Sequence, residues 1–126
     1  MSGSILVVDD DPTMRELLRI HLANAGYAVD VARDGLEAGY GVLRNPPDLI
    51  ISDVNMPHLD GFEFIAALRE EAKYREIPVI FLTTTTDGES RGRQLGAVGY
   101  VGKPVHADQL LSMVAAHVSG GRVPIG

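Results

Sequence analysis

The sequence has no cysteine and an excess of acidic over basic residues. Because cysteine is absent from all 126 residues, disulfide bonds and thiolate metal sites are excluded, and a reducing compartment is compatible. Lysine and arginine together number 11 against 17 aspartates and glutamates, which gives a net charge of -6. Generic nucleic-acid binding needs a basic face, so this balance argues against it. A divalent cation or a basic protein partner fits the charge better.

Long apolar runs are also missing. The run nearest the N-terminus stops at Val8 and has no basic residues before it, so it is too short for a signal peptide. The other runs are equally short, and none predicts a membrane span. We therefore expect a cytoplasmic protein. The length and the 45% hydrophobic content predict one domain over 1–119, followed by a flexible tail or linker remnant over 120–126.

Short apolar runs alternate with longer amphipathic stretches along the chain. Four runs are continuous and rich in aliphatic residues, which is typical of strands buried on both faces of a parallel sheet. They cover residues 5–8, 49–51, 79–82 and, more weakly, 99–101. A fifth run, over 27–32, alternates apolar with polar residues and predicts a half-exposed edge strand.

The stretches between these runs predict helices. Asp11 followed by Pro12 is a helix start, and Gly26 is a good helix stop. Capping-box spacing predicts three more starts. The paired residues are Asp34 with Glu37, Asp60 with Glu63, and Thr86 with Glu89. Apolar stripes at helical spacing are expected in three helices: Met14, Leu17, Leu18, Leu22 and Ala25; Ile65, Leu68 and Ala72; and Leu110, Leu111, Val114 and Val118.

Two of the expected helices are weak. The second contains Gly39 and Gly41, each of which costs about 1 kcal/mol relative to alanine in a helix interior. The fourth, near residues 87–96, contains Gly92 and has Leu95 as its one large apolar residue. We expect it to be short and mobile.

The resulting order is a strand followed by a helix, five times. Strict alternation with helical crossovers predicts an α/β fold in which a five-stranded parallel sheet is covered by helices on both faces. The flavodoxin-like, doubly wound (βα)5 arrangement with strand order 2-1-3-4-5 is the leading topology.

Unusual polar residues fall just after the predicted strands. They are Asp9, Asp10 and Asp11 after the first run, Asp53 after the third, Thr83 after the fourth and Lys103 after the fifth. The carboxyl ends of parallel strands line the ligand crevice of an open sheet, so we expect these side chains to gather there.

Such a cluster suits a hard divalent cation and phosphoryl chemistry. Carboxylates close together repel one another unless a cation joins them, and oxygen ligands favour Mg²⁺, or Mn²⁺, over zinc or copper. A carboxylate beside the metal can attack phosphorus and form an aspartyl phosphate. Lysine would then neutralise the transferred charge, and a threonine hydroxyl would bind a phosphoryl oxygen.

Four sequence blocks resemble the signature of bacterial response-regulator receiver domains, in the same order and at similar spacing. They are Ile-Leu-Val-Val-Asp-Asp-Asp over 5–11, Ile-Ser-Asp-Val-Asn-Met-Pro over 51–57, Leu-Thr-Thr over 82–84 and Gly-Lys-Pro over 102–104. The resemblance covers residues 4–118. It implies a two-component signalling module that is switched by phosphorylation.

The resemblance also assigns roles at the metal site. It implies that Asp53 is the phosphorylated aspartate and a metal ligand. Asp10 would be a direct ligand, Asp9 would act through water, and Asn55 would offer its backbone carbonyl. The implied cofactor is Mg²⁺, with Mn²⁺ as a substitute.

Further roles concern the readout of the phosphoryl group. Lys103 resembles the phosphate-binding lysine, and its bond to Pro104 is often cis in this family. Thr83 resembles the switch hydroxyl and Tyr100 the switch aromatic, although an aromatic in a strand also suits core or edge packing. The expected output surface is the fourth helix, fifth strand and fifth helix.

The implied partners are a sensor histidine kinase or a histidine phosphotransfer protein, and a downstream protein target or a missing effector domain. The chain would act as a monomer or a phosphorylation-dependent dimer, and its only catalysis would be its own phosphorylation and dephosphorylation. One alternative is a pseudo-receiver, an adaptor that needs no phosphate. Another is an aspartyl phosphatase or phosphotransferase, although that class has a second Asp where this chain has Asn55.

Overall fold

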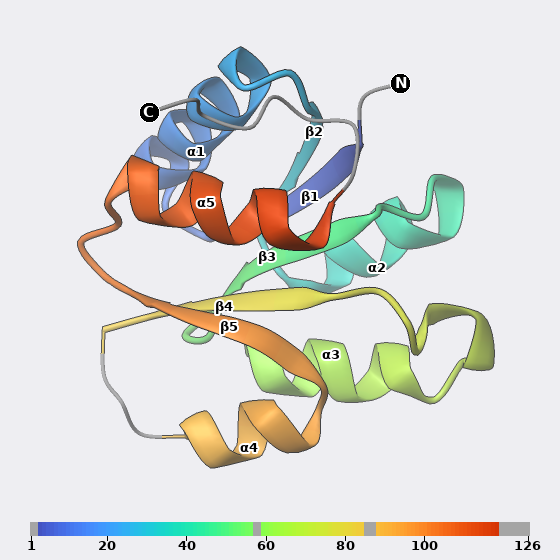
Figure 1. The fold of residues 1–126 in the computed structure, drawn as a ribbon. Helices are drawn as coiled ribbons and strands as arrows, with labels where there is room; N and C mark the ends of the chain where they lie inside the picture. The colour runs from blue at the N-terminus through green and yellow to red at the C-terminus, as the bar shows by residue number, and fades with distance from the viewer. Residues whose placement is uncertain (1–2, 57–58, 85–87, 119–126) are drawn as a thin grey trace.

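A central parallel sheet with helices on both faces forms the architecture (Figure 1). The computed structural model describes residues 3–56, 59–84 and 88–118. The predicted tail over 120–126 and the predicted cap at Thr86 lie outside these residues. In the described parts of the chain, no helix combines the length and the apolar content that crossing a bilayer requires.

The elements alternate as the sequence predicts. The strands are β1 (Ser4–Val8), β2 (Ala28–Ala32), β3 (Leu49–Asp53), β4 (Val79–Thr83) and β5 (Ala97–Gly102). The helices are α1 (Pro12–Asn24), α2 (Gly35–Arg44), α3 (Gly61–Arg69), α4 (Glu89–Gln94) and α5 (Ala107–His117), with a short 3-10 turn, η1 (Ala72–Tyr74), after α3.

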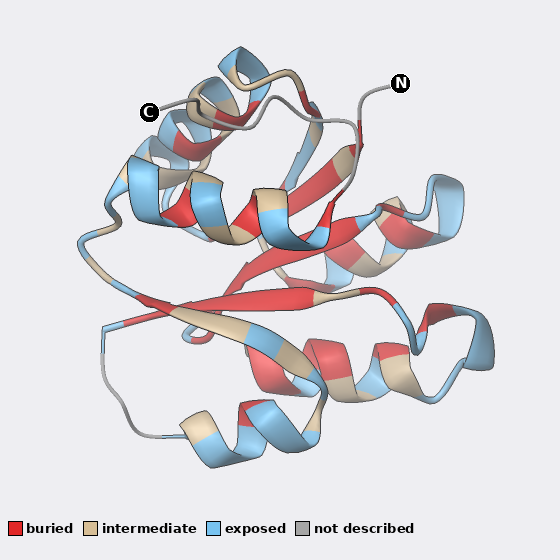
Figure 2. Cartoon of the chain, in the orientation of Figure 1, coloured by how far each residue is buried: buried red, intermediate tan, exposed pale blue. Residues whose placement is uncertain are grey.

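The strand order β2-β1-β3-β4-β5 confirms the predicted topology. All four strand pairings are parallel. β1, β3 and β4 lie inside the sheet and are almost wholly buried, whereas the edge strand β2 is largely exposed (Figure 2). Continuous apolar runs and an alternating run therefore distinguish the inner strands from this edge, as expected.

Two hydrophobic clusters lie on opposite faces of the sheet because neighbouring residues in a strand point to opposite sides. In β1, Leu6 and Val8 belong to the cluster under α2 and α3, whereas Ile5 and Val7 belong to the cluster under α1 and α5. α4 packs on β5 at the other edge of the sheet from β2.

The helix starts and stops depend on local chemistry. Asp11 caps α1 by accepting a hydrogen bond from the backbone N–H of Thr13, and Gly26 follows the helix with a positive φ of 100°. Asp60 and Glu63 form the complete capping box predicted for α3. Asp34 caps α2, but the Glu37 carboxylate accepts from Arg33 rather than from the cap residue.

Two helix predictions need correction, and the fourth helix has narrower bounds than predicted. Leu17 was assigned to the buried stripe of α1 but is 46% exposed, because the buried face is carried by Leu18 and Leu22. Ala72 is not part of α3, which ends at Arg69 before the chain tightens into η1, and Ala72 is exposed. α4 is even shorter than the predicted 87–96.

Glycines with positive φ bound α4 at both ends. Gly88 is its N-cap, with φ of 84° and no side-chain capping bond, and Gly96 follows it with φ of 85°. These left-handed conformations favour glycine and end a right-handed helix. The short helix was therefore correctly expected.

Candidate functional site

The candidate site lies at the carboxyl ends of four neighbouring strands. Asp9 and Asp10 follow β1, Asp53 ends β3, Thr83 ends β4, and Lys103 follows β5. Since the strand order places β1, β3, β4 and β5 side by side, residues more than 90 positions apart in sequence meet at one edge. The predicted gathering of polar residues is confirmed for Asp9, Asp10, Asp53 and Lys103 by the contacts among them.

Asp9 is fully buried and held by several hydrogen bonds. Its Oδ1 accepts from the backbone N–H of Asp11 at 2.9 Å, and its own N–H donates to the carbonyl of Ala32 at 3.1 Å. The guanidinium of Arg15 donates to the Asp9 carbonyl at 2.9 Å. These bonds tie the acidic loop to β2 and to α1, so the carboxylate has a fixed position.

Asp53 is 4% exposed and ends the most deeply buried part of the sheet. Its Oδ1 accepts from the backbone N–H of Asn55 at 3.3 Å. The Ser52 hydroxyl donates to the Asp53 carbonyl at 3.0 Å, and the next residue, Val54, donates its N–H to Leu82 in β4. The backbone around the carboxylate is therefore anchored on both sides.

Lys103 joins the two buried carboxylates. Its Nζ lies 3.1 Å from Oδ2 of Asp53 and 3.4 Å from Oδ2 of Asp9. The backbone N–H of Lys103 donates to the carbonyl of Thr83 at 2.8 Å, which fixes the start of the loop after β5. The Lys103–Pro104 peptide bond is cis, as the resemblance implies.

The pKa values of the cluster move in the directions that burial and like charge require. Burial raises the pKa of Asp53, and the negative charge of Asp9 raises it further, whereas Lys103 lowers it. Burial likewise raises the pKa of Asp9, against the opposing effects of the Asp11 N–H and Lys103. Burial lowers the pKa of Lys103, but the two carboxylates outweigh this effect and raise it. The negative charge in this cluster is therefore only partly compensated.

The donor set fits a hard divalent cation. One carboxylate oxygen from each of Asp9, Asp10 and Asp53 lies within 4.8 Å of the others. Asp10 is exposed, so the cluster faces solvent on one side while Asp9 and Asp53 are buried on the other. Mg²⁺ commonly binds to one or two carboxylates and keeps several waters, which suits a half-open oxygen site. The role of the Asn55 carbonyl as a further ligand stays a prediction.

Thr83 and Tyr100 lie on neighbouring strands at different depths. Thr83 is 7% exposed and pairs in register with Gly102, whereas Tyr100 pairs with Phe81. The Tyr100 ring packs against that of Phe81 with centroids 5.6 Å apart, and its hydroxyl donates to the carbonyl of Gly88 at 3.4 Å. The core-packing interpretation of Tyr100 thus holds in this conformation, and its switch role stays a prediction.

Two supporting residues escaped the sequence analysis. A Cβ atom on Gly61 would lie 2.3 Å from the carbonyl oxygen of Asp53, so the start of α3 can approach the end of β3 only because residue 61 is glycine. Arg15 reaches the Asp9 carbonyl from the first turns of α1. The sequence does show Gly61 directly after the Asp60 cap. The close contact that this glycine permits depends on how α3 packs against β3, which the sequence does not show.

Comparison with known proteins identifies the family. The family model for the response regulator receiver domain matches residues 5–115. This chain belongs to that family. Receiver domains are signalling modules of two-component systems rather than conventional enzymes, and they interact with histidine kinases or phosphotransfer proteins.

Curated relatives of this receiver domain are often longer. The chain is 38% identical over 114 residues to response regulator Rre1 of Synechocystis sp., which covers 88% of this chain and 49% of that protein. An uncharacterised 14.6 kDa protein of Leptolyngbya boryana is 44% identical over 112 residues, covering 87% of this chain and 86% of the relative. The receiver domain thus spans about half of Rre1 but most of the second protein.

Solved structures agree with the fold. Chemotaxis protein CheY4 of Vibrio cholerae superimposes with a TM-score of 0.88 at 36% identity, covering 93% of this chain and 99% of that chain. A putative response regulator of Chloroflexus aurantiacus gives a TM-score of 0.86 at 33% identity, with 92% and 97% covered. The five-stranded sheet and its order are therefore those of the family.

Proposed function

We propose that this receiver domain accepts a phosphoryl group on Asp53 in a Mg²⁺-dependent transfer from a phosphohistidine of a kinase or phosphotransfer protein. The observation that carries the proposal is the position of Lys103, whose Nζ lies within 3.4 Å of both Asp53 and Asp9. A cation next to the attacking carboxylate can stabilise the charge that develops on a transferring phosphoryl group.

The chemistry follows from the cluster. An Asp53 carboxylate oxygen attacks phosphorus while the bond from phosphorus to the histidine nitrogen breaks, and the leaving imidazole takes a proton from solvent. Bound Mg²⁺ would supply charge neutralisation for the phosphoryl oxygens. Asp9 and Asp10 are the residues that would hold it with Asp53. The Lys103 ammonium group would form an ion pair with the transferred phosphoryl group, and the Thr83 hydroxyl would donate a hydrogen bond to one of its oxygens.

Phosphorylation would then change the surface formed by α4, β5 and α5. The new group would add about -1.5 to -2 of charge by analogy with other phosphorylated side chains. A shift of Thr83 toward it would open space on β4 that Tyr100 could enter. The supporting observation is the weak anchoring of α4, in which Gly92 is the one buried residue among the six.

A small phosphodonor tests the acceptor assignment. With Mg²⁺ present, intact-protein mass spectrometry should show one added phosphoryl group that is stable in acid and labile in alkali. Asp53→Asn should remain unlabelled, whereas Asp30→Asn, at an exposed aspartate on β2, should label like the wild type. Equal labelling of Asp53→Asn would reject the assignment. No labelling of the wild type would favour the pseudo-receiver alternative.

The readout has its own test. Backbone NMR spectra recorded with and without phosphorylation should show shifts concentrated in α4, β5 and α5. Thr83→Ala should still be labelled on Asp53 but should show smaller shifts in these elements. Equal shifts in the wild type and Thr83→Ala would remove Thr83 from the pathway.

A further inference from the structure

α2 carries the three most exposed large apolar side chains in the described parts of the chain. Leu36, Tyr40 and Leu43 are 66%, 60% and 64% exposed, whereas the next, Leu17 on α1, is 46% exposed. Their spacing of four and three residues places them on one face of the helix. We call these three side chains the α2 ridge. An exposed contiguous apolar surface of this kind is typical of a protein contact.

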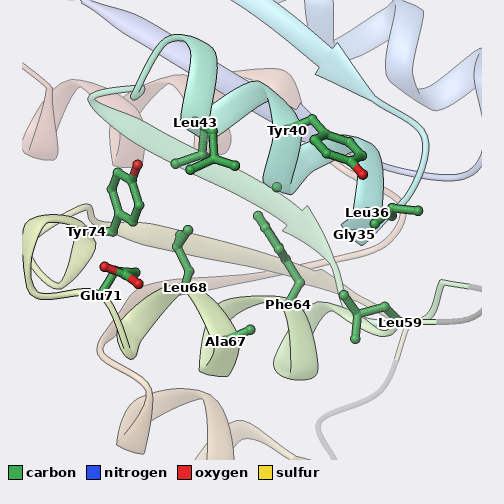
Figure 3. A pocket seen from close by; sticks show the side chains of 12 residues that line it. Gly35, Leu36, Tyr40, Leu43, Leu59, Phe64, Ala67, Leu68, Glu71 and Tyr74 are labelled. Carbon is green, nitrogen blue, oxygen red and sulfur yellow. The ribbon is translucent and has the colours of Figure 1, made fainter.

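A hollow lies beside the α2 ridge, between α2 and α3. It has a volume of about 330 Å³ and is lined mainly by apolar side chains, among them Phe64 and Leu68 of α3. Figure 3 shows these two side chains pointing from α3 toward α2, with Leu59 at one end and Tyr74 at the other. Glu71 is the one charged residue in the lining. The three side chains of the α2 ridge also line this hollow, so the ridge and the hollow form one apolar surface.

Gly39 lies between the members of the α2 ridge and lines the same hollow. A Cβ atom added there would meet no atom within 4 Å, so no packing neighbour in the described chain requires glycine at this position. Glycine weakens a helix interior relative to alanine. What the missing side chain provides is a depression that lets another backbone or a large side chain approach α2.

A second copy of this chain suits the surface. In a symmetric dimer the same patch is used by both copies, so protrusion and hollow must lie on one face, as they do here. If two α2 helices pair antiparallel around residues 39 and 40, Tyr40 faces Gly39 of the second copy. Leu36 then faces Leu43 of the second copy.

The charges of α2 support the antiparallel arrangement. Asp34 and Glu37 lie at its N-terminal end, and the exposed Arg44 lies at its C-terminal end. Arg33 pairs with Glu37 at 3.4 Å and leaves Asp34 as the excess acidic charge. Antiparallel pairing brings each Arg44 to the acidic end of the other helix, whereas parallel pairing would bring like charges together. The opposed helix dipoles favour the same arrangement.

We propose that this receiver domain forms a symmetric dimer through α2, in which the α2 ridges of the two copies pack against each other across Gly39 and cover the adjoining hollows. The contact uses neither Asp53 nor the expected output surface of α4, β5 and α5. It therefore forms without phosphorylation, and its test does not depend on the phosphoacceptor assignment.

Sedimentation equilibrium of the unphosphorylated chain tests the proposal between about 10 μM and about 1 mM, where small interfaces associate. The wild type should show a concentration-dependent monomer–dimer equilibrium. Leu36→Lys and Leu43→Lys should each raise the dissociation constant by about tenfold or more. Leu17→Lys replaces an exposed leucine on another helix, α1. Its dissociation constant should stay within about twofold of the wild-type value.

Gly39→Gln separates assembly from folding. Because its side chain has open space in the single chain, it should raise the thermal stability measured at low concentration, while it weakens the dimer by about tenfold or more. A wild type that remains monomeric up to about 1 mM would overturn the proposal, even if it bound another protein. An unchanged dissociation constant for Gly39→Gln would also overturn it. The same holds if Leu17→Lys raised the dissociation constant as much as Leu43→Lys does.

Discussion

The hydroxyl oxygen of Tyr100 lies 1.3 Å from the point where a Cβ atom on Gly92 would stand. The ring carbon that carries the hydroxyl lies 2.4 Å from the same point. Tyr100 can therefore pack under α4 only because residue 92 has no side chain. This contact joins β5 to α4 at the surface on which we expect the phosphorylation signal to be read.

Gly92→Ala should expel the Tyr100 ring from beneath α4 or displace the helix. The clash should cost about 1–3 kcal/mol of unfolding free energy, against a gain of up to about 1 kcal/mol from the better helix propensity of alanine. Urea denaturation measures the net loss, and near-UV circular dichroism reports the changed surroundings of the tyrosine.

The same substitution should raise the unfolding free energy, rather than lower it, when residue 100 carries no aromatic ring. In a Tyr100→Ala background, Gly92→Ala should raise the unfolding free energy by up to about 1 kcal/mol, because only the propensity gain remains. A loss of equal size in both backgrounds would show that the contact between Gly92 and Tyr100 does not limit the helix.

Mg²⁺ should stabilise the fold through the acidic cluster. A ligand that binds only the native state raises the midpoint of thermal unfolding, and the rise grows with its concentration relative to the dissociation constant. Asp10→Asn removes the exposed carboxylate that we propose as a ligand, without emptying a packed position, so it should abolish most of the Mg²⁺-dependent rise. Asp30→Asn, on β2, should respond to Mg²⁺ like the wild type, and an equal loss of response there would argue against a local site.

The sequence predicted the strands better than the helix ends. Short, continuous apolar runs such as 79–82 are typical of strands buried on both faces of a parallel sheet, so the sequence pattern was informative. The side of α1 that faces the core was harder to predict, because Leu17 and Leu18 are neighbours and only packing decides which is buried. Ala72 suits a helix by type, but the turn after Arg69 depends on tertiary contacts.

The candidate site was predictable because parallel strands end together. Asp9, Asp53 and Lys103 could be placed at one edge from the order of strands, and their contacts follow that order. The close approach at Gly61 could not be predicted, because it depends on the distance between α3 and β3. The exposure of the α2 ridge could not be predicted either. Apolar residues at helical spacing usually indicate a buried face, so the sequence does not show that these side chains are exposed.

Asp53→Asn should stabilise the metal-free protein at neutral pH. Burial and the charge of Asp9 raise the pKa of Asp53 above its ordinary value of 3.8, despite Lys103, so the folded state binds its proton more readily than the unfolded state. The cost that ionising Asp53 imposes on the unfolding free energy is therefore absent below pH 3.8, develops as the pH rises from there to the folded-state pKa, and is constant above it.

Urea denaturation in a chelator, followed as a function of pH, measures this cost. The difference in unfolding free energy between Asp53→Asn and the wild type should be small in acid, grow as the pH rises, and level off once Asp53 is ionised in both states. A constant difference across the range would mean that the charge of Asp53 is not the cause.

Gly61→Ala should damage the site without removing any of its polar groups. The added methyl group would lie 2.3 Å from the Asp53 carbonyl oxygen and 3.1 Å from Cα of Val54, and neither backbone atom can move without shifting the end of β3. We expect a loss of about 1–3 kcal/mol in unfolding free energy. Labelling by a small phosphodonor should also slow, by about tenfold or more, because the Asp53 carboxylate that we propose as the acceptor is displaced.

Gly41→Ala is the matched control for this change. Its added Cβ would meet its nearest neighbour, Cδ1 of Leu6, at 3.9 Å, which is an ordinary contact. Because residue 41 lies within α2, the substitution should stabilise the fold by up to about 1 kcal/mol and leave the labelling rate unchanged. If Gly61→Ala instead labelled as fast as Gly41→Ala, the close packing of α3 on β3 would have no part in positioning the acceptor, and the role inferred for Gly61 would be wrong.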